Sequence, residues 1–269
     1  MMNAFLWSIR RELWENRSLY IAPLAAAVIF VAGFAMRLAF AAPSPASARG
    51  PYTFATLAIM GTGVVVAIFY CLEALYAERR DRSILFWKSL PVSDWATVLA
   101  KAAIPLVVLP LLTTAITSVV HIVMLVIESA ALLVRGQGVA QLWQEVAPLR
   151  LALELLYHML GIHILWYAPI FAWLLLASAW ARRAPFLWAG IPILAIVIVE
   201  NLVFATSGFF DMLKYRLVGG PESFIGSDDL MGHVEPGVLF GNPQLWIGLA
   251  LTFIFLAGAV RIRRQNAPA

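Results

Sequence analysis

The sequence predicts an all-α membrane protein with six transmembrane helices. Of its 269 residues, 62% are hydrophobic and only 13% are charged, whereas soluble chains are roughly 45–50% apolar and about 25% charged. The apolar residues gather in six runs, each near or above the roughly 20 residues that cross the hydrocarbon of a bilayer. The runs lie near residues 19–41, 52–76, 102–127, 155–180, 186–206 and 243–260.

Residues 1–18 precede the first run, and their pattern predicts an amphipathic helix on the membrane surface. Apolar side chains recur there at helical spacing, and charged side chains occupy the other positions. The apolar set is Met2, Phe5, Leu6, Ile9 and Leu13. A signal peptide is the alternative, but the following apolar run exceeds a normal signal core, and acidic residues ahead of it are unusual there. We therefore expect residues 19–269 to form a single membrane domain.

The stretch between the second and third runs, residues 78–94 (ERRDRSILFWKSLPVSD), combines basic and aromatic side chains. On a helix most of its polar residues would face one side and most of its apolar residues the other. Pro91 then blocks helix continuation, and Ser93 or Asp94 can accept hydrogen bonds from the first backbone amides of a following helix. The pattern predicts a short interfacial helix, a stop and a new helix.

The distribution of positive charge sets the expected orientation, because cytoplasmic segments are enriched in Lys and Arg. If the N-terminus is inside, the cytoplasmic segments hold 13 of the 19 Lys and Arg residues, and both ends of the chain are cytoplasmic. These are Arg10, Arg11, Arg17, Arg79, Arg80, Arg82, Lys88, Lys101, Arg182, Arg183, Arg261, Arg263 and Arg264. The clusters lie beside apolar runs, which is typical of an orientation signal and not of a nucleic-acid surface. We expect a multi-pass protein of the inner (plasma) membrane.

Two stretches resemble the ABC-2 type transporter permeases, the membrane-spanning subunits of ABC exporters. They run from Glu78 to Lys101 and from Leu165 to Pro192, and together cover roughly a fifth of the chain. The resemblance implies that the 78–94 loop carries a cytoplasmic coupling helix, which the ATPase subunit receives. It also implies short re-entrant helices between spans 5 and 6, where the apolar and acidic segment 207–242 is too apolar for a free linker.

The resemblance implies an exporter permease that acts as a dimer, with a second copy or a paralogue, and with separate ABC ATPase subunits. The chain has no G-x-x-x-x-G-K-[ST] motif, so we expect ATP and Mg²⁺ on the partner and no catalytic residue or cofactor in this chain. Charge, aromatic content and resemblance together assign ATPase coupling to Glu78, Arg79, Arg80, Asp81, Arg82, Lys88, Pro91 and Asp94. A plain headgroup-contacting loop, or a scaffold that docks a soluble partner on it, is the alternative.

Ionisable residues inside apolar runs are costly and therefore candidates for function. They are Glu73, His121, His158, His163 and Glu200. Glu73 is expected to pair with Arg79, Arg80 or an N-terminal arginine, and the other four to share a polar zone in the outer leaflet. That zone suggests either a substrate surface or a structural link in which Glu200 bonds to a neighbouring helix. No HExxH or G-x-S-x-G motif supports an enzyme. Gly61 and Gly63 are expected to be close-packing positions.

Overall fold

The computed structural model describes residues 2–40, 49–81, 92–219 and 236–265, and every regular element among them is a helix. Six helical segments are long and apolar enough to cross a membrane, which confirms the number and location of the predicted spans. They are Ser18–Phe40, Gly50–Arg80, Asp94–Val134, Ala140–Trp180, Pro185–Phe204 and Pro243–Gln265.

The first three spans contain α2 (Ser18–Phe40), α3 (Gly50–Ala74), α4 (Tyr76–Arg80), α6 (Asp94–Ala103), the π-helical turn η2 (Ile104–Val108) and α7 (Leu109–Val134). The fourth contains α8 (Ala140–Val146), α9 (Pro148–His158), the π-helical turn η3 (Met159–His163) and α10 (Ile164–Trp180). The fifth is α11 (Pro185–Val199) with η4 (Glu200–Phe204), and the sixth is α15 (Pro243–Gln265). The remaining helices are α1 (Met2–Glu15), α12 (Gly208–Lys214), η5 (Tyr215–Gly219) and α14 (Pro236–Gly241).

Spans 3 and 4 are longer than the sequence predicts, at 41 residues each. Hydropathy marks only the part of a helix that suits hydrocarbon, whereas the backbone hydrogen bonds of a helix continue into polar flanks. Pro105 lies in η2, where the wider turn accommodates a residue that cannot donate a backbone hydrogen bond. Both spans therefore extend past the bilayer core that the sequence delimits.

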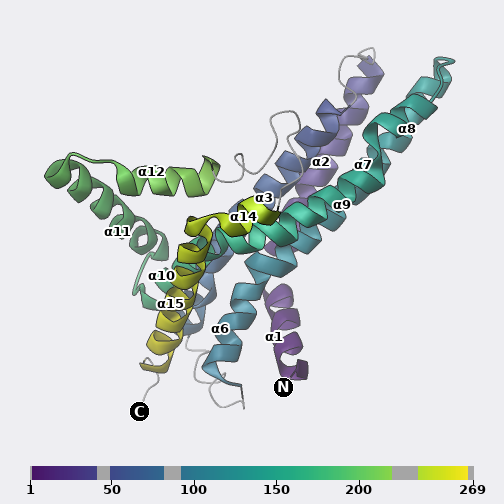
Figure 1. The fold of residues 1–269 in the computed structure, drawn as a ribbon. Helices are drawn as coiled ribbons and strands as arrows, with labels where there is room; N and C mark the ends of the chain where they lie inside the picture. Colours follow the sequence, from purple (N-terminus) through teal and green to yellow (C-terminus); the bar gives the residue numbers. More distant parts are fainter. Residues whose placement is uncertain (1, 41–48, 82–91, 220–235, 266–269) are drawn as a thin grey trace.

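Figure 1 shows both ends of the chain at the same end of the helical bundle, which we call the terminal end. The opposite end, where α8 and the tips of α2, α3 and α7 lie, is the far end. One buried apolar cluster joins α3, α6, α10 and α15 towards the terminal end, and a second joins α2, α3, α7 and α8 towards the far end. The longest helix–helix interface is that between α10 and α15.

The fifth span is the least buried of the six spans. Of α11 only Ala189 is buried, and α11 and α12 project from the bundle in Figure 1. Short helices do follow span 5, in α12 and η5, as the sequence predicts. That they re-enter the membrane stays a prediction.

Two neighbouring glycines of α3 provide a test of the packing. A Cβ on Gly63 would lie 2.7 Å from Cγ2 of Thr113 on α7, whereas one on Gly61 would meet nothing within 4 Å. We predict that Gly63→Val destabilises the protein by roughly 1–3 kcal/mol, because it overpacks the α3–α7 interface, and that Gly61→Val leaves stability nearly unchanged. Thermal unfolding of both variants in the same detergent measures the difference. Equal melting temperatures would contradict this interface.

Candidate functional site: a buried charge cluster at the terminal end

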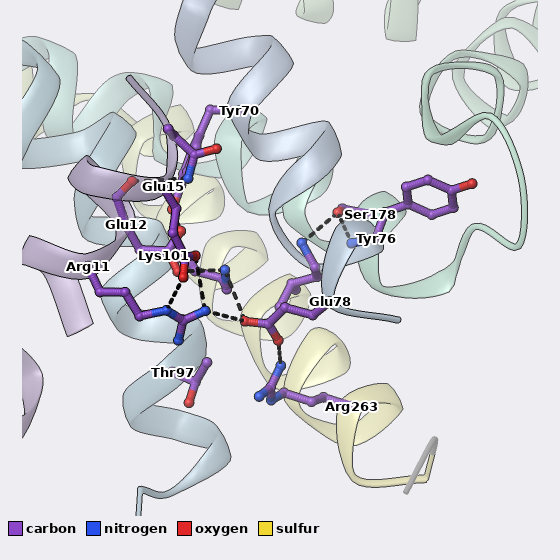
Figure 2. Close-up of polar contacts among 12 residues, drawn as sticks. Arg11, Glu12, Glu15, Tyr70, Tyr76, Glu78, Thr97, Lys101, Ser178 and Arg263 are labelled. Atoms are coloured by element: carbon purple, nitrogen blue, oxygen red, sulfur yellow. Dashed lines mark hydrogen bonds and ion pairs between the residues drawn. The ribbon is translucent and has the colours of Figure 1, made fainter. Parts of the chain in front are cut away.

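Charged side chains from four helices meet inside the protein at the terminal end (Figure 2). They come from α1, α4, α6 and α15, which are far apart in the sequence. The central members are Glu12, Glu78, Lys101 and Arg263, each at most 5% exposed. With Asp94, which joins them from the start of α6, they are called the charge cluster below.

Lys101 is the link between α1 and α4. Its Nζ lies 2.7 Å from Oε1 of Glu12 and 3.2 Å from Oε1 of Glu78. The second carboxylate oxygen of Glu12 accepts a hydrogen bond of 2.8 Å from the hydroxyl of Tyr70 on α3. A buried charge is tolerated only when it is paired and hydrogen-bonded. Lys101 and its two acids therefore fix α1 against α6 and the end of span 2.

Arg263 closes the cluster from the last span. Its Nη1 donates to Oε2 of Glu78, and its Nε lies 3.0 Å from Oδ1 of Asp94. Asp94 opens α6 next to Ser93, whose Oγ accepts a hydrogen bond of 3.1 Å from the backbone amide of Ala96. This helix cap is one of the two that the sequence predicts. Asp94 and Lys101 lie two turns apart on α6 and so reach the same cluster.

The charge cluster borders a cavity of about 330 Å³ between α1, α4 and α6. Arg11 lies beside Glu78 and Glu15 (Figure 2). Its Nη2 is 3.9 Å from Oε1 of Glu78, and its Nε is 2.7 Å from Oε1 of Glu15. Three acids (Glu12, Glu78 and Asp94) face the buried cations Lys101 and Arg263, and two further cations, Arg11 and Arg264, lie 3.9 Å from Glu78 and 3.8 Å from Asp94, respectively. The arrangement holds helices α1, α4, α6 and α15 together.

Next to the charge cluster, the end of span 2 is attached to the end of span 4. The Oγ of Ser178 accepts hydrogen bonds from the backbone amides of Leu75 and Tyr76, at 3.0 and 2.9 Å. Nη2 of Arg79 donates to the carbonyl oxygens of Ser178 and Ala181, at 2.6 and 2.7 Å. Carbonyls at a helix C-terminus lack intrahelical partners, so Arg79 satisfies the end of α10.

The residues that the sequence assigns to ATPase coupling differ in how far they are buried in the structure. Glu78 is 5% exposed and contacts Lys101 and Arg263 of its own chain. Arg80 and Asp81 are exposed and pair with each other at 3.0 Å. Arg82, Lys88 and Pro91 lie outside the described residues, and the coupling assignment as a whole stays a prediction.

The intramembrane candidates have separate surroundings. Glu73 pairs with Arg80 at 2.8 Å, one of the arginines that the sequence offers. His121 Nε2 lies 3.1 Å from both Oγ1 of Thr56 and the carbonyl oxygen of Tyr52, on α3. His163 Nε2 lies 3.3 Å from the carbonyl oxygen of Pro105, in η2. Both histidines thus join neighbouring spans.

Glu200 bonds to the segment that follows it. Its carboxylate accepts hydrogen bonds from the backbone amide of Phe209, at 2.9 Å, and from Oγ1 of Thr206, at 3.2 Å. It therefore supports the first turn of α12. His158 lies at the end of α9, one residue before η3. Within the described ranges no hydrogen bond joins any two of the four residues expected to form a shared zone.

Sequence reasoning missed the pairing of Glu12, Lys101 and Arg263, although a signal exists. Glu12 stands three residues after Ile9 and one before Leu13, so it falls on the apolar face of α1. Lys101 and Arg263 likewise fall among the buried positions of α6 and α15. A charge at a core-facing position requires a partner, but spacing alone does not say which one.

The chain matches no protein-family model, no curated protein and no solved structure.

Single and double substitutions test whether the charge cluster contributes more to stability than ion pairs on the surface do. We predict that Lys101→Met destabilises the protein by about 3–5 kcal/mol, because it leaves two buried acids short of one cation. The double variant Glu12→Gln, Lys101→Met removes one charge of each sign and should recover much of that loss. Thermal unfolding in detergent measures both.

The matched control is Arg80→Met, which removes a cation from the exposed pairs with Glu73 and Asp81. Exposed ion pairs contribute little, so its melting temperature should stay near that of the unmodified protein. Equal losses for Lys101→Met and for the double variant would contradict charge pairing as the role of Lys101.

Proposed function

We propose that the chain is the membrane-spanning permease subunit of an ATP-driven ABC-2 type exporter. It would form the translocation pathway as a dimer, with a second copy or a paralogue, and would couple to separate ABC ATPase subunits. In this proposal the terminal end faces the cytoplasm of an inner or plasma membrane. The resemblance in residues 78–101 motivates the family, and the charge cluster gives the coupling a physical route.

The observation that best supports the proposal is where the connection between spans 2 and 3 is attached. Helix α4, which precedes the connection, carries Glu78, and α6, which follows it, begins at Asp94; both of these acids bond to Arg263. A displacement of the connection would therefore act on α15 through Arg263 and on α1 through Lys101. A soluble partner that pushes on residues 81–93 would move several membrane helices together.

The least buried span suits assembly with a second permease chain. In the most apolar stretch of the fifth span only 6% of the residues are buried within one chain, so its surface is available to lipid and to another copy. Among the described helices α11 packs mainly on α10, where Nε1 of Trp173 donates to the carbonyl oxygen of Ala189 at 3.1 Å, and in the proposed movement it has no direct contact with the charge cluster. The proposal is that movement at the terminal end changes the packing of α11 against the second subunit and opens the pathway outward.

The partner can be tested directly. We predict that the tagged chain, purified from its native membrane in mild detergent, brings with it a P-loop ATPase that hydrolyses ATP. Reversing two charges in the loop, Arg80→Glu with Arg82→Glu, should detach that ATPase, because the loop would repel the surface that receives it. Mass spectrometry of the eluate and an ATPase assay measure the loss.

The matched control is Arg182→Glu with Arg183→Glu, which reverses two exposed arginines between α10 and α11 at the same end of the bundle. It should retain the ATPase. A chain recovered alone, or with a partner that lacks a nucleotide site, would count against the exporter and in favour of a membrane scaffold. Retention of the ATPase by both variants would move the docking surface away from the loop.

A further inference from the structure

An apolar groove lies at the far end between α2 and the start of α3. Its volume is about 460 Å³, which is within the range of about 300–1,000 Å³ typical of small-molecule sites. Phe30 and Phe34 form one wall, and Pro51 and Phe54 form the other. Gly33 widens the groove, because a Cβ there would meet nothing within 4 Å.

The groove has a positive charge at its outer rim. Arg37 lines it one turn beyond Gly33, in the last turn of α2. Arg37 is the nineteenth residue after Ser18, the start of α2, which corresponds to a rise of about 29 Å at about 1.5 Å per residue. The hydrocarbon core of a bilayer is also about 30 Å thick. If α2 spans it, the guanidinium reaches the headgroups while Phe30 and Phe34 remain among the acyl chains.

Arg37 is exposed, and within the part of the chain that the structure describes it makes no hydrogen bond or ion pair. Other arginines at this end are engaged: Arg49 donates to the carbonyl oxygen of Glu145 at 2.6 Å, and Arg135 to that of Leu38 at 3.2 Å. Residues 41–48, which follow α2, contain no acid in their sequence. Arg37 therefore offers its donors to an external anion.

We propose that this groove binds an anionic phospholipid of the outer leaflet, with its phosphate at Arg37 and an acyl chain along Phe30, Phe34 and Phe54. A guanidinium matches the geometry of a phosphate with two parallel hydrogen bonds. An acyl chain moves here from one apolar surrounding to another, so the groove positions the lipid and Arg37 selects its charge. The groove and Arg37 are separate from the charge cluster, and only the assignment to the outer leaflet rests on the orientation given under the proposed function.

Native mass spectrometry of the purified full chain tests the site, with phosphatidylglycerol and phosphatidylcholine of the same acyl chains as probes. The first phosphatidylglycerol should bind more tightly than phosphatidylcholine. Arg37→Gln should weaken it about fivefold, the effect of about 1 kcal/mol for one basic residue at a membrane surface. Gly33→Phe should weaken both lipids, because the added ring fills the groove.

Two controls separate the site from general effects. Arg150→Gln removes another exposed far-end arginine, one that already pairs with Glu154 at 2.7 Å, and Gly61→Phe adds a ring to another open position on a span. Both should bind phosphatidylglycerol as the unmodified chain does. Equal affinity for the two lipids, or equal losses in Arg37→Gln and Arg150→Gln, would overturn the proposal. It would also fail if Gly33→Phe left lipid binding intact but changed a dimer to a monomer in light scattering, which would make the groove a contact between copies.

Discussion

A lysine buried inside a protein needs an acid beside it, and this requirement organises the terminal end of the bundle. Lys101 is 2% exposed and lies between Glu12 and Glu78. Glu78 then binds Arg263, which also holds Asp94. Because removing one member leaves another charge buried without its partner, the helices that carry these residues are constrained to stay together. The fold at this end combines that mutual pairing with the buried apolar cluster of α3, α6, α10 and α15.

Among the described helices, one group is held together by the charge cluster, whereas the fifth span is not part of that group. The helices α1, α4, α6 and α15 share the charge cluster, and α10 joins them through Ser178 and its long interface with α15. By contrast α11 has one buried residue, Ala189. The segment after it is linked to α12 by the hydrogen bond that the backbone amide of Phe209 donates to Glu200. A force on the terminal end would therefore act on α1, α4, α6 and α15 together. The fifth span meets the rest of the described bundle mainly through α10, where Trp173 donates a hydrogen bond to the carbonyl oxygen of Ala189.

Local and periodic features of this fold were predictable from the sequence, and long-range pairing was not. Apolar runs set the six spans because each must fill the same hydrocarbon thickness, and the cap at Ser93 follows from a signal within four residues. The partners of Glu12 and Arg263 lie 89 and 185 residues away, respectively, where spacing carries no information. Glu200 was expected near histidines, but a backbone amide nine residues on satisfies it.

The measurement that tests the central claim most directly is hydrogen exchange of the α1 amides in the full chain in detergent. If the charge cluster holds α1 in place, Glu12→Gln should speed exchange in residues 9–15 and leave α11 unchanged, because the charged acceptor for Lys101 is lost. Arg80→Gln, which changes only exposed pairs, should not alter α1. Unchanged exchange in Glu12→Gln would mean that α1 is held by its apolar surface alone, and it would contradict the charge cluster as the link between α1 and the spans.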